Sequence, residues 1–245
     1  MKRLTFILLT VLVAAACRKV SPEQRIAQIS NYFDKTNLTY ADDIRRFDGQ
    51  KRIDYLTLAL AREIGADDIW TLEQAGENSL VAVFPGREKR MTRYSLLSAS
   101  LDDPDACAAV LNTLRAFKDL KLKPDGTIHA LFYSTAEDTT GLSGLGATFK
   151  EIRDAGDQLT FEMEISAQDS LPHKTFIIED KEFFANQIIE VVPPYLKSLG
   201  TYRFQKGSYP NPAWPIKLPV YRYNLDAADF PGESAVLTVF ALLLN

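Results

Sequence analysis

The sequence contains few of the side chains that build zinc centres and disulfide frameworks. Only two histidines and two cysteines occur among its 245 residues, too few cysteines for a disulfide-rich scaffold. Basic residues are not in excess, because the net charge is -4 and lysines and arginines are interspersed with acids. This pattern offers no surface for nucleic acid. The remaining composition, 46% hydrophobic and 24% charged residues, is typical of one globular domain with a sizeable core.

The N-terminus has the pattern of a targeting segment. Lys2 and Arg3 precede the apolar run 4–13, and three alanines then lead to Cys17. The apolar run is too short to span a bilayer as a helix. The pattern predicts a signal peptide over residues 1–16 and resembles a bacterial lipoprotein box, in which the cysteine is lipidated and becomes the mature N-terminus. The alternative is an ordinary secretory signal with an incidental cysteine.

Lipidation would fix both the location and the redox chemistry of the chain. Acyl chains on Cys17 would tether the protein to a membrane leaflet of the bacterial cell envelope without a transmembrane span. Cys107 would then have no partner for an intrachain disulfide. We expect residues 17–30 to form a tether and residues 31–245 to form a single domain.

Strand and helix patterns alternate along the rest of the chain. The run 94–100 is almost continuously apolar, as expected for a strand buried on both faces of a parallel sheet. Predicted strands cover 67–73, 78–85, 94–100, 127–134, 159–165 and 218–223, and predicted helices cover 22–35, 49–64, 106–117, 148–155, 177–199 and 234–244. The alternation predicts an α/β fold with three αβα layers and a mixed, mostly parallel central sheet.

Acidic residues follow two of the predicted buried strands, where each strand gives way to a helix. Asp102, Asp103 and Asp105 come after one strand, and Glu137 and Asp138 come after the next. The carboxyl ends of parallel strands meet at one sheet edge, where ligands and metals bind in open α/β folds. A simpler explanation is that these acids only complement helix N-termini, but it does not account for both clusters meeting at the same edge.

The order of these motifs resembles a known enzyme family. The strand end 98–102 (SASLD), the acidic turn before 141–144 (GLSG) and the strand segment 161–163 (FEM) follow one another as in the M28 family of zinc aminopeptidases. The resemblance spans roughly 49–244, with its specific motifs between 98 and 164. In that family carboxylates and imidazoles hold a pair of zinc ions, and a glutamate acts as general base on the bridging water.

The resemblance assigns roles to several acids of this sequence. Glu137 matches the general base, Asp102 the orienting carboxylate, Asp103 the bridging ligand (with Asp105 as the alternative) and Asp138 a terminal ligand. The spacing from these acids to the glycine turn is one residue longer than in the family, which would otherwise make Asp138 the base.

The fourth ligand position falls on the strand that contains Glu162 and Glu164. Because residues two apart on a strand share a face, either side chain could reach the cleft; Glu162 is the one we assign.

The histidine ligands of the family have no counterpart. Ser100 stands at the position of the first, and 224–226 (NLD) follows the last predicted strand where the second should occur. His129 lies near the start of its strand, far from Glu137, and His173 lies in a polar loop. Carboxylates alone suit Mg²⁺, Ca²⁺ or Mn²⁺ better than a zinc pair. We therefore expect no cofactor, with zinc or another divalent metal required only if the protein is active.

Three functions are compatible with this pattern. The favoured one is a non-catalytic lipoprotein that uses the cleft or its rim to bind a peptide or a protein. The alternative is an active metal-dependent aminopeptidase or related hydrolase with Glu137 as base. The third is acyl chemistry like that of glutaminyl cyclases on the same fold.

Overall fold

The computed structural model describes residues 20–74, 76–87, 93–136, 145, 146, 148, 158–167, 171–179, 183–207 and 220–244. Its helices are α2 (Pro22–Lys35), α3 (Tyr40–Arg45), α4 (Gly49–Ala59), α5 (Pro104–Asp119), α7 (Phe183–Leu196) and α8 (Phe230–Leu244), with short helical turns at Leu60–Ile64, Lys197–Leu199 and Ala227–Asp229. Its strands are β1 (Ile69–Gln74), β2 (Glu77–Phe84), β3 (Arg93–Ser100), β4 (Thr127–Tyr133), β5 (Gln158–Ser166), β6 (Thr175–Glu179), β7 (Arg203–Lys206) and β8 (Val220–Asn224).

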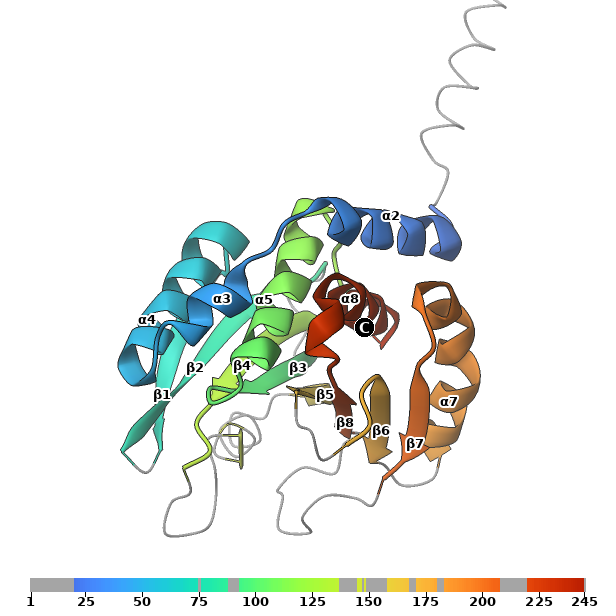
Figure 1. Cartoon of the computed structure of the whole chain (residues 1–245). Helices are drawn as coiled ribbons and strands as arrows, with labels where there is room; N and C mark the ends of the chain where they lie inside the picture. The colour runs from blue at the N-terminus through green and yellow to red at the C-terminus, as the bar shows by residue number, and fades with distance from the viewer. Residues whose placement is uncertain are drawn as a thin grey trace, which may run out of the picture.

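The described strands form one mixed sheet, in the order β1-β2-β4-β3-β5-β8-β6-β7 (Figure 1). The central strands β4, β3, β5 and β8 are parallel to one another, and β6 is parallel to β7. The antiparallel pairs are β1 with β2, β2 with β4, and β6 with β8. This confirms the predicted α/β class with a mixed, mostly parallel sheet.

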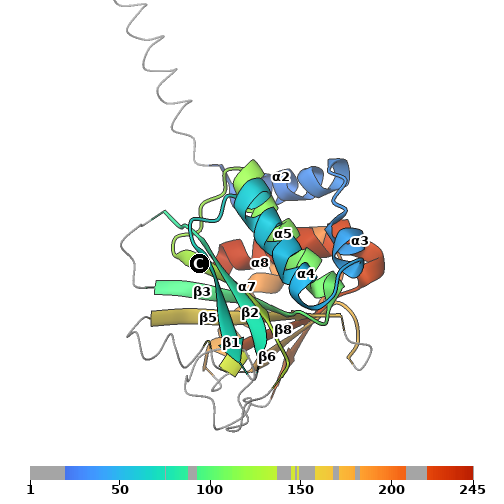
Figure 2. The ribbon, with the colours of Figure 1, turned by 90° about the vertical axis from the view of Figure 1, so that its left-hand side faces the viewer.

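The main hydrophobic core lies between the sheet and a layer of helices. Alternate residues of β5, such as Met163 and Ile165, face α5, in which Val110 and Phe117 are fully buried. Helices α2, α3, α4 and α5 lie together above the sheet, with α8 beside them (Figures 1 and 2). Successive side chains of a strand point to opposite faces, so alternate residues of β5 all face the same layer of helices.

The opposite face of the sheet has its own smaller cluster. Leu96 and Leu131 of the central strands pack there with Leu145, which belongs to a helical turn. Helical residues therefore cover both faces of the sheet, as the three-layer expectation requires. Glu162 and Glu164 of β5 also face this side, since they alternate with the core residues of that strand.

Helix α2 begins at Pro22 and belongs to the folded part of the protein. Its start is a capping box, in which Ser21 Oγ accepts from the Gln24 backbone N–H at 3.3 Å and Gln24 Oε1 accepts from the Ser21 N–H at 3.0 Å. Ile26 and Ile29 are buried in the main core. The folded unit thus starts near residue 22, earlier than the boundary at residue 31 expected from the sequence.

The predicted helix 177–199 is wrong at its beginning. Residues Thr175–Glu179 form strand β6 between β7 and β8, and the helix starts only at Phe183. Pro193 and Pro194 lie inside α7 rather than ending it. A short apolar run such as FII fits a buried strand and a buried helix equally well by periodicity, and pairing with β8 decides in favour of the strand.

One helical stretch in the described part of the chain, Ala227–Leu244, is long and apolar enough to cross a membrane. Half of it is buried inside the protein. Val236, Leu237 and Phe240 of α8 are fully buried in the main core, so the apolar character of this helix is explained by its packing.

Candidate functional site

A cavity opens at the carboxyl ends of the central parallel strands. Its volume is about 400 Å³, and its polar lining includes Asp102, Asp103, Asp105, Tyr133, Thr135 and Glu164. These side chains come from the turn after β3 and the start of α5, from the end of β4 and the residues after it, and from the end of β5. Asp102, Asp103 and Asp105, which all follow β3, therefore lie at this sheet edge with Glu164 of β5, whereas the meeting of the two predicted acidic clusters stays a prediction because Glu137 and Asp138 lie outside the described residues.

Asp103 caps helix α5 and ties it to β5. Its Oδ1 accepts from the Ala106 backbone N–H at 2.9 Å, and its Oδ2 accepts from the Ala167 backbone N–H at 2.7 Å. Pro104 follows at the first helical position, where its missing N–H has no cost. Both oxygens of this carboxylate thus serve the backbone.

Replacing Asp103 with alanine should lower the free energy of unfolding by about 1–2 kcal/mol, because an N-cap and a second backbone acceptor are lost together. Asp102→Ala is the matched control, since Asp102 is exposed and, among the described residues, its Oδ2 accepts from the side chain of Thr135 (Oγ1 at 2.9 Å) rather than from the backbone; a change within about 0.5 kcal/mol is expected there. Urea unfolding of the two variants gives the comparison. Equal effects would contradict the capping role.

Asp105 is engaged by a cation from another helix. Its Oδ1 is ion-paired with Arg45 of α3, which also contacts Asp42. Partial burial raises the pKa of Asp105, and the Arg45 guanidinium opposes that increase. The pair fixes α3 against the start of α5, which is a structural role for this acid.

Glu164 contacts a guanidinium from the adjacent strand. Arg222 of β8 is the register partner of Glu164, and its Nε lies 3.1 Å from Glu164 Oε2 and 3.6 Å from Glu179 Oε2. These are ion-pair contacts whose angles do not make a hydrogen bond to Nε. Tyr133 Oη donates to Glu164 Oε1 at 2.8 Å. One fixed cation therefore faces two carboxylates, one of which also accepts from a tyrosine.

Glu162, which the sequence assigned to the fourth ligand position, does not line the cavity. It is fully buried, and Ser98 Oγ donates to its Oε1 at 2.6 Å. Its Oε2 is buried too and has no hydrogen-bond partner among the described residues. Burial and then the charge of Glu164 raise the pKa of Glu162 well above its usual value. Of the two alternatives left open by the sequence, Glu164 lines the cavity and Glu162 does not.

Neither histidine lies among the residues that line this cavity. The ring of His129 stacks on that of Tyr94 with their centroids 4.2 Å apart, within the sheet. His173 is exposed, and its Nδ1 lies 2.6 Å from the carbonyl oxygen of Leu225. Each imidazole therefore has a contact of its own elsewhere in the described part of the chain.

The expected base Glu137, the expected ligand Asp138 and the expected lipidation site Cys17 lie outside the described residues. Within the described part, no group of three or more His, Cys, Asp or Glu side chains could hold a metal ion. Glu137 and Asp138 thus keep the roles that the resemblance implies only as predictions.

The donors described at this edge do not fit a zinc pair. Zinc sites combine imidazole or thiolate donors with carboxylates, whereas the described lining offers neither imidazole nor thiolate, and most of its carboxylates are already used by the protein. Asp103 accepts two backbone N–H groups and Glu164 faces a guanidinium. A metal at Glu164 would have to displace or repel the positive charge of Arg222.

The sequence reasoning missed Arg222, although a signal was present. An arginine in the apolar segment VYRYN is unusual for a central strand and calls for a buried partner. The partner of Arg222 depends on the register in which β8 pairs with β5 and β6, and the sequence alone does not give that register.

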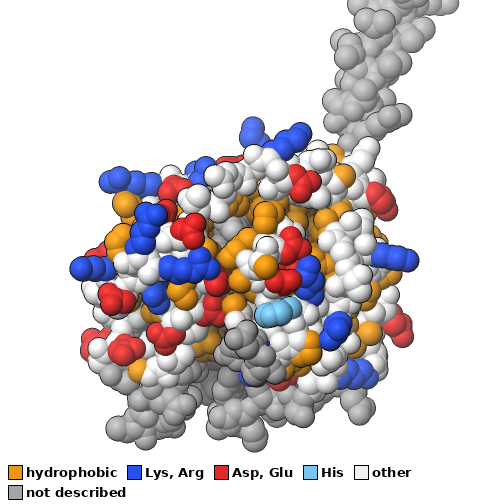
Figure 3. Space-filling model, in the orientation of Figure 1, with side chains coloured by type: hydrophobic (Ala, Val, Ile, Leu, Met, Phe, Trp, Pro, Cys, Tyr) orange, Lys and Arg blue, Asp and Glu red, His pale blue; other side chains and the backbone are white. Residues whose placement is uncertain are grey.

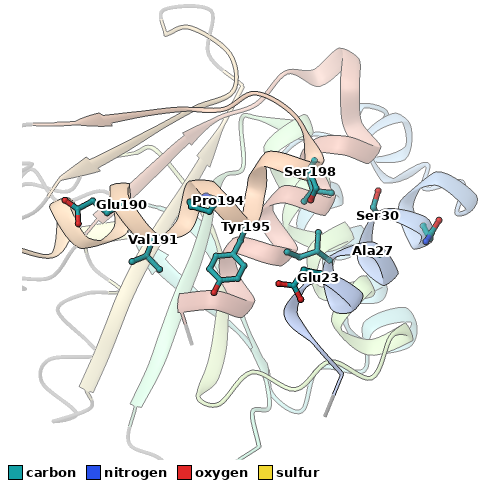
Figure 4. Close-up of a pocket in the computed structure, with 11 residues that line it drawn as sticks. Glu23, Ala27, Ser30, Glu190, Val191, Pro194, Tyr195 and Ser198 are labelled. Carbon is teal, nitrogen blue, oxygen red and sulfur yellow. The ribbon is translucent and has the colours of Figure 1, made fainter. Parts of the chain in front are cut away.

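A larger groove of about 730 Å³ lies between α2 and α7 (Figure 4) and shares no lining residue with the acidic cavity. Glu23 and Ala27 of α2 line it together with Glu190, Val191 and Tyr195 of α7, and Tyr195 lies near Glu23. The carboxylates among its described lining residues are Glu23 and Glu190, and they belong to different helices. The groove has the character of a binding surface rather than of a catalytic centre.

No protein-family model and no curated protein sequence matches the chain. Solved structures do resemble it. A Zn-dependent exopeptidase from Parabacteroides distasonis has a TM-score of 0.57 at 13% identity, covering 91% of this chain and 98% of that one. A glutaminyl cyclase from Bacteroides thetaiotaomicron has a TM-score of 0.60 at 12% identity, covering 85% and 96%. A peptidase M28 precursor from Shewanella amazonensis has a TM-score of 0.53 at 18% identity, covering 69% and 44%.

These similarities define the fold of the chain. It is the α/β fold shared by Zn-dependent exopeptidases and glutaminyl cyclases, as the motif order suggested. At such low identities, a common fold does not carry activity with it. The side chains at the sheet edge must decide the chemistry.

Proposed function

We propose that this chain is a lipid-anchored, non-catalytic member of the exopeptidase-like fold, which binds a peptide or a protein segment at the acid edge of its sheet. The observation that carries the proposal is the contact of Arg222 with Glu164 and Glu179. A guanidinium cannot lose its charge in a protein, so this part of the edge has its own permanent cation and does not need a metal to balance Glu164.

The cavity favours a positively charged ligand group. Arg222 faces Glu164 and Arg45 faces Asp105, whereas no described cation is ion-paired with Asp102 or Asp103. Asp102 is exposed and lines the cavity, where it could accept from an amine. A peptide amino terminus or a lysine side chain would satisfy it.

Binding can be located with two substitutions. Labelled peptides with cationic ends are titrated against the mature protein, and affinity is read by fluorescence anisotropy. Asp102→Asn should weaken binding by about tenfold, because a charge-assisted hydrogen bond is lost. Glu190→Gln in the α2–α7 groove should leave it unchanged. The opposite pattern would move the binding site to that groove.

The second candidate is an active metal-dependent hydrolase, favoured by the zinc-dependent proteins that share the fold. We expect the mature protein to show no turnover of aminoacyl reporters or of glutaminyl peptides, with or without added zinc or manganese. Metal-dependent turnover that is lost in Glu137→Gln and retained in Glu190→Gln would establish the hydrolase and refute the non-catalytic proposal.

The anchor rests on the segment that ends at Cys17. Mass spectrometry of the N-terminal peptide from membrane fractions should show removal of residues 1–16 and acyl chains on the cysteine. An unmodified cysteine, or an uncleaved N-terminus, would refute the anchor and leave the binding proposal to its own test.

A further inference from the structure

A basic cavity lies where the folded part of the chain begins. Arg25 of α2, Arg87, Lys121 and Lys123 line it, together with Asp125, which is ion-paired with Arg87 at 3.1 Å. Four cations and one anion give a local charge of +3 (4 − 1), although the whole chain carries -4. We call these four cations the basic patch.

Apolar side chains border the basic patch. Val20 is 42% exposed and Leu243, near the end of α8, is 37% exposed, and both line the same cavity of about 450 Å³. On the face of the molecule shown in Figure 3, by contrast, basic and acidic side chains are interspersed. Basic groups beside exposed apolar ones are the combination that anionic lipid surfaces attract.

The basic patch lies at the opposite edge of the sheet from the acidic cavity. Lys121, Lys123 and Asp125 precede β4, whereas Thr135 follows it and lines the acidic cavity. The seven residues of β4 separate the two edges by roughly 23 Å at about 3.3 Å per residue. Figure 2 shows the C-terminus next to the beginnings of β3 and β5, on the side away from their carboxyl ends.

The expected anchor is close to this patch along the chain. Only Arg18 and Lys19 separate Cys17 from Val20, so the cysteine lies within about 11 Å of Val20 even when this segment is fully extended. Both intervening residues are basic and add to the positive charge near the bilayer. An acyl chain on Cys17 therefore holds the patch at the membrane surface.

We propose that the basic patch docks on anionic phospholipid headgroups and so orients the anchored protein, with the acidic cavity facing away from the membrane. The proposal rests on the lipid anchor of the proposed function. The anchor alone would let the domain tumble. Docking of the patch adds a second contact and leaves the acidic cavity open to a partner in the surrounding medium.

The experiment uses the lipidated mature protein in vesicles that carry a quencher at the headgroup level. A fluorophore is attached to Leu243→Cys, which lines the same cavity as the patch, or to Thr135→Cys at the opposite edge, and Cys107 stays unlabelled because it is fully buried. With phosphatidylglycerol in the vesicles, the label at 243 should be quenched severalfold more than the label at 135. Neutral vesicles or high salt should remove the difference.

Charge-reversal variants provide the matched control. Lys121→Glu with Lys123→Glu should abolish the difference between the labels, whereas Lys35→Glu with Lys51→Glu, an equal change at exposed positions outside the cavity, should preserve it. Equal quenching of both labels in anionic vesicles would overturn the proposal.

The anchor and the patch can fail separately. If Cys17 proves unlipidated, the anchor fails, and the labelled protein added to anionic vesicles at low salt still tests the patch. Salt-sensitive quenching at 243 would then support docking, and its absence would overturn it.

Discussion

Replacing Arg222 with methionine should lower the free energy of unfolding by about 2–3 kcal/mol near pH 7.5. The substitution leaves Glu164 and Glu179 without their shared cation while their side chains stay only 17% and 10% exposed. Removing one partner of a buried ion pair costs about 3–5 kcal/mol. The lower value is expected here because the Arg222 side chain is 38% exposed, and water screens part of the loss.

The effect of Arg222→Met should depend on pH in a definite direction. Arg222 lowers the pKa of Glu162 and of Glu179, both of which burial already raises. Without the guanidinium these pKa values rise further in the folded state. A carboxyl with a raised folded-state pKa destabilises the protein as the pH rises above its unfolded-state value. The deficit should therefore be larger near pH 8 than near pH 5.

Urea unfolding of the wild type, Arg222→Met and Arg203→Met at both pH values provides the measurement. Arg203 is an exposed arginine at the edge strand β7 and should show changes within about 0.5 kcal/mol. An Arg222→Met protein as stable as the wild type near pH 7.5 would show that the acids at this edge do not rely on the guanidinium. The contact of Arg222 with Glu164 and Glu179 would then no longer support the proposed function.

A second large effect is expected at Glu233 of α8. This side chain is fully buried, accepts from Tyr223 Oη and lies 3.8 Å from Lys174 Nζ. Burial raises its pKa to about 7, against the hydrogen bond from Tyr223, which lowers it. The folded state therefore retains a proton that the unfolded chain releases near pH 4.5.

The consequence is a loss of stability with rising pH. The contribution of Glu233 is greatest below the unfolded-state pKa and is lost as the pH rises to about 7. At about 1.36 kcal/mol per unit of pKa, the wild type should lose about 2–3 kcal/mol relative to Glu233→Gln between pH 5 and pH 8. Because the amide does not titrate, the difference between the two proteins isolates this residue.

Urea unfolding at intervals of pH tests this expectation. Asp229→Asn is the control, because Asp229 lies in the same neighbourhood and pairs with Lys174 but is exposed; its slope should follow that of the wild type. Parallel pH profiles for the wild type and Glu233→Gln would contradict the raised pKa.

Much of the fold was predictable because its strands carry strong local patterns. The segment 94–100 and the segment 127–134 are apolar almost throughout, and each is followed by helix-start or turn residues, so β3 and β4 were found with their boundaries nearly correct. Strand β6 was not, because FII is too short to show a period. Only its pairing with β8, which joins residues about 45 apart, distinguishes it from a helical turn.

The acid edge was predictable in part for a similar reason. Asp102 and Asp103 follow β3 directly, so the position of that strand also fixes theirs. The choice between Glu162 and Glu164 could not be made, because alternation places both on one face. Depth in the sheet separates them, and the contact of Glu164 with Arg222 depends on the register of β8. Such information lies in tertiary pairing and not in any local pattern.

The most direct test is calorimetric titration of the purified mature protein with Zn²⁺, alongside Arg222→His. We expect no stoichiometric zinc binding by the wild type at micromolar concentrations, because both oxygens of Asp103 accept from backbone N–H groups and Arg222 supplies the positive charge at Glu164. Arg222→His removes that fixed charge and adds an imidazole, so any zinc binding should appear there first. One or two equivalents of tightly bound zinc in the wild type, lost in Glu164→Gln, would contradict the non-catalytic account.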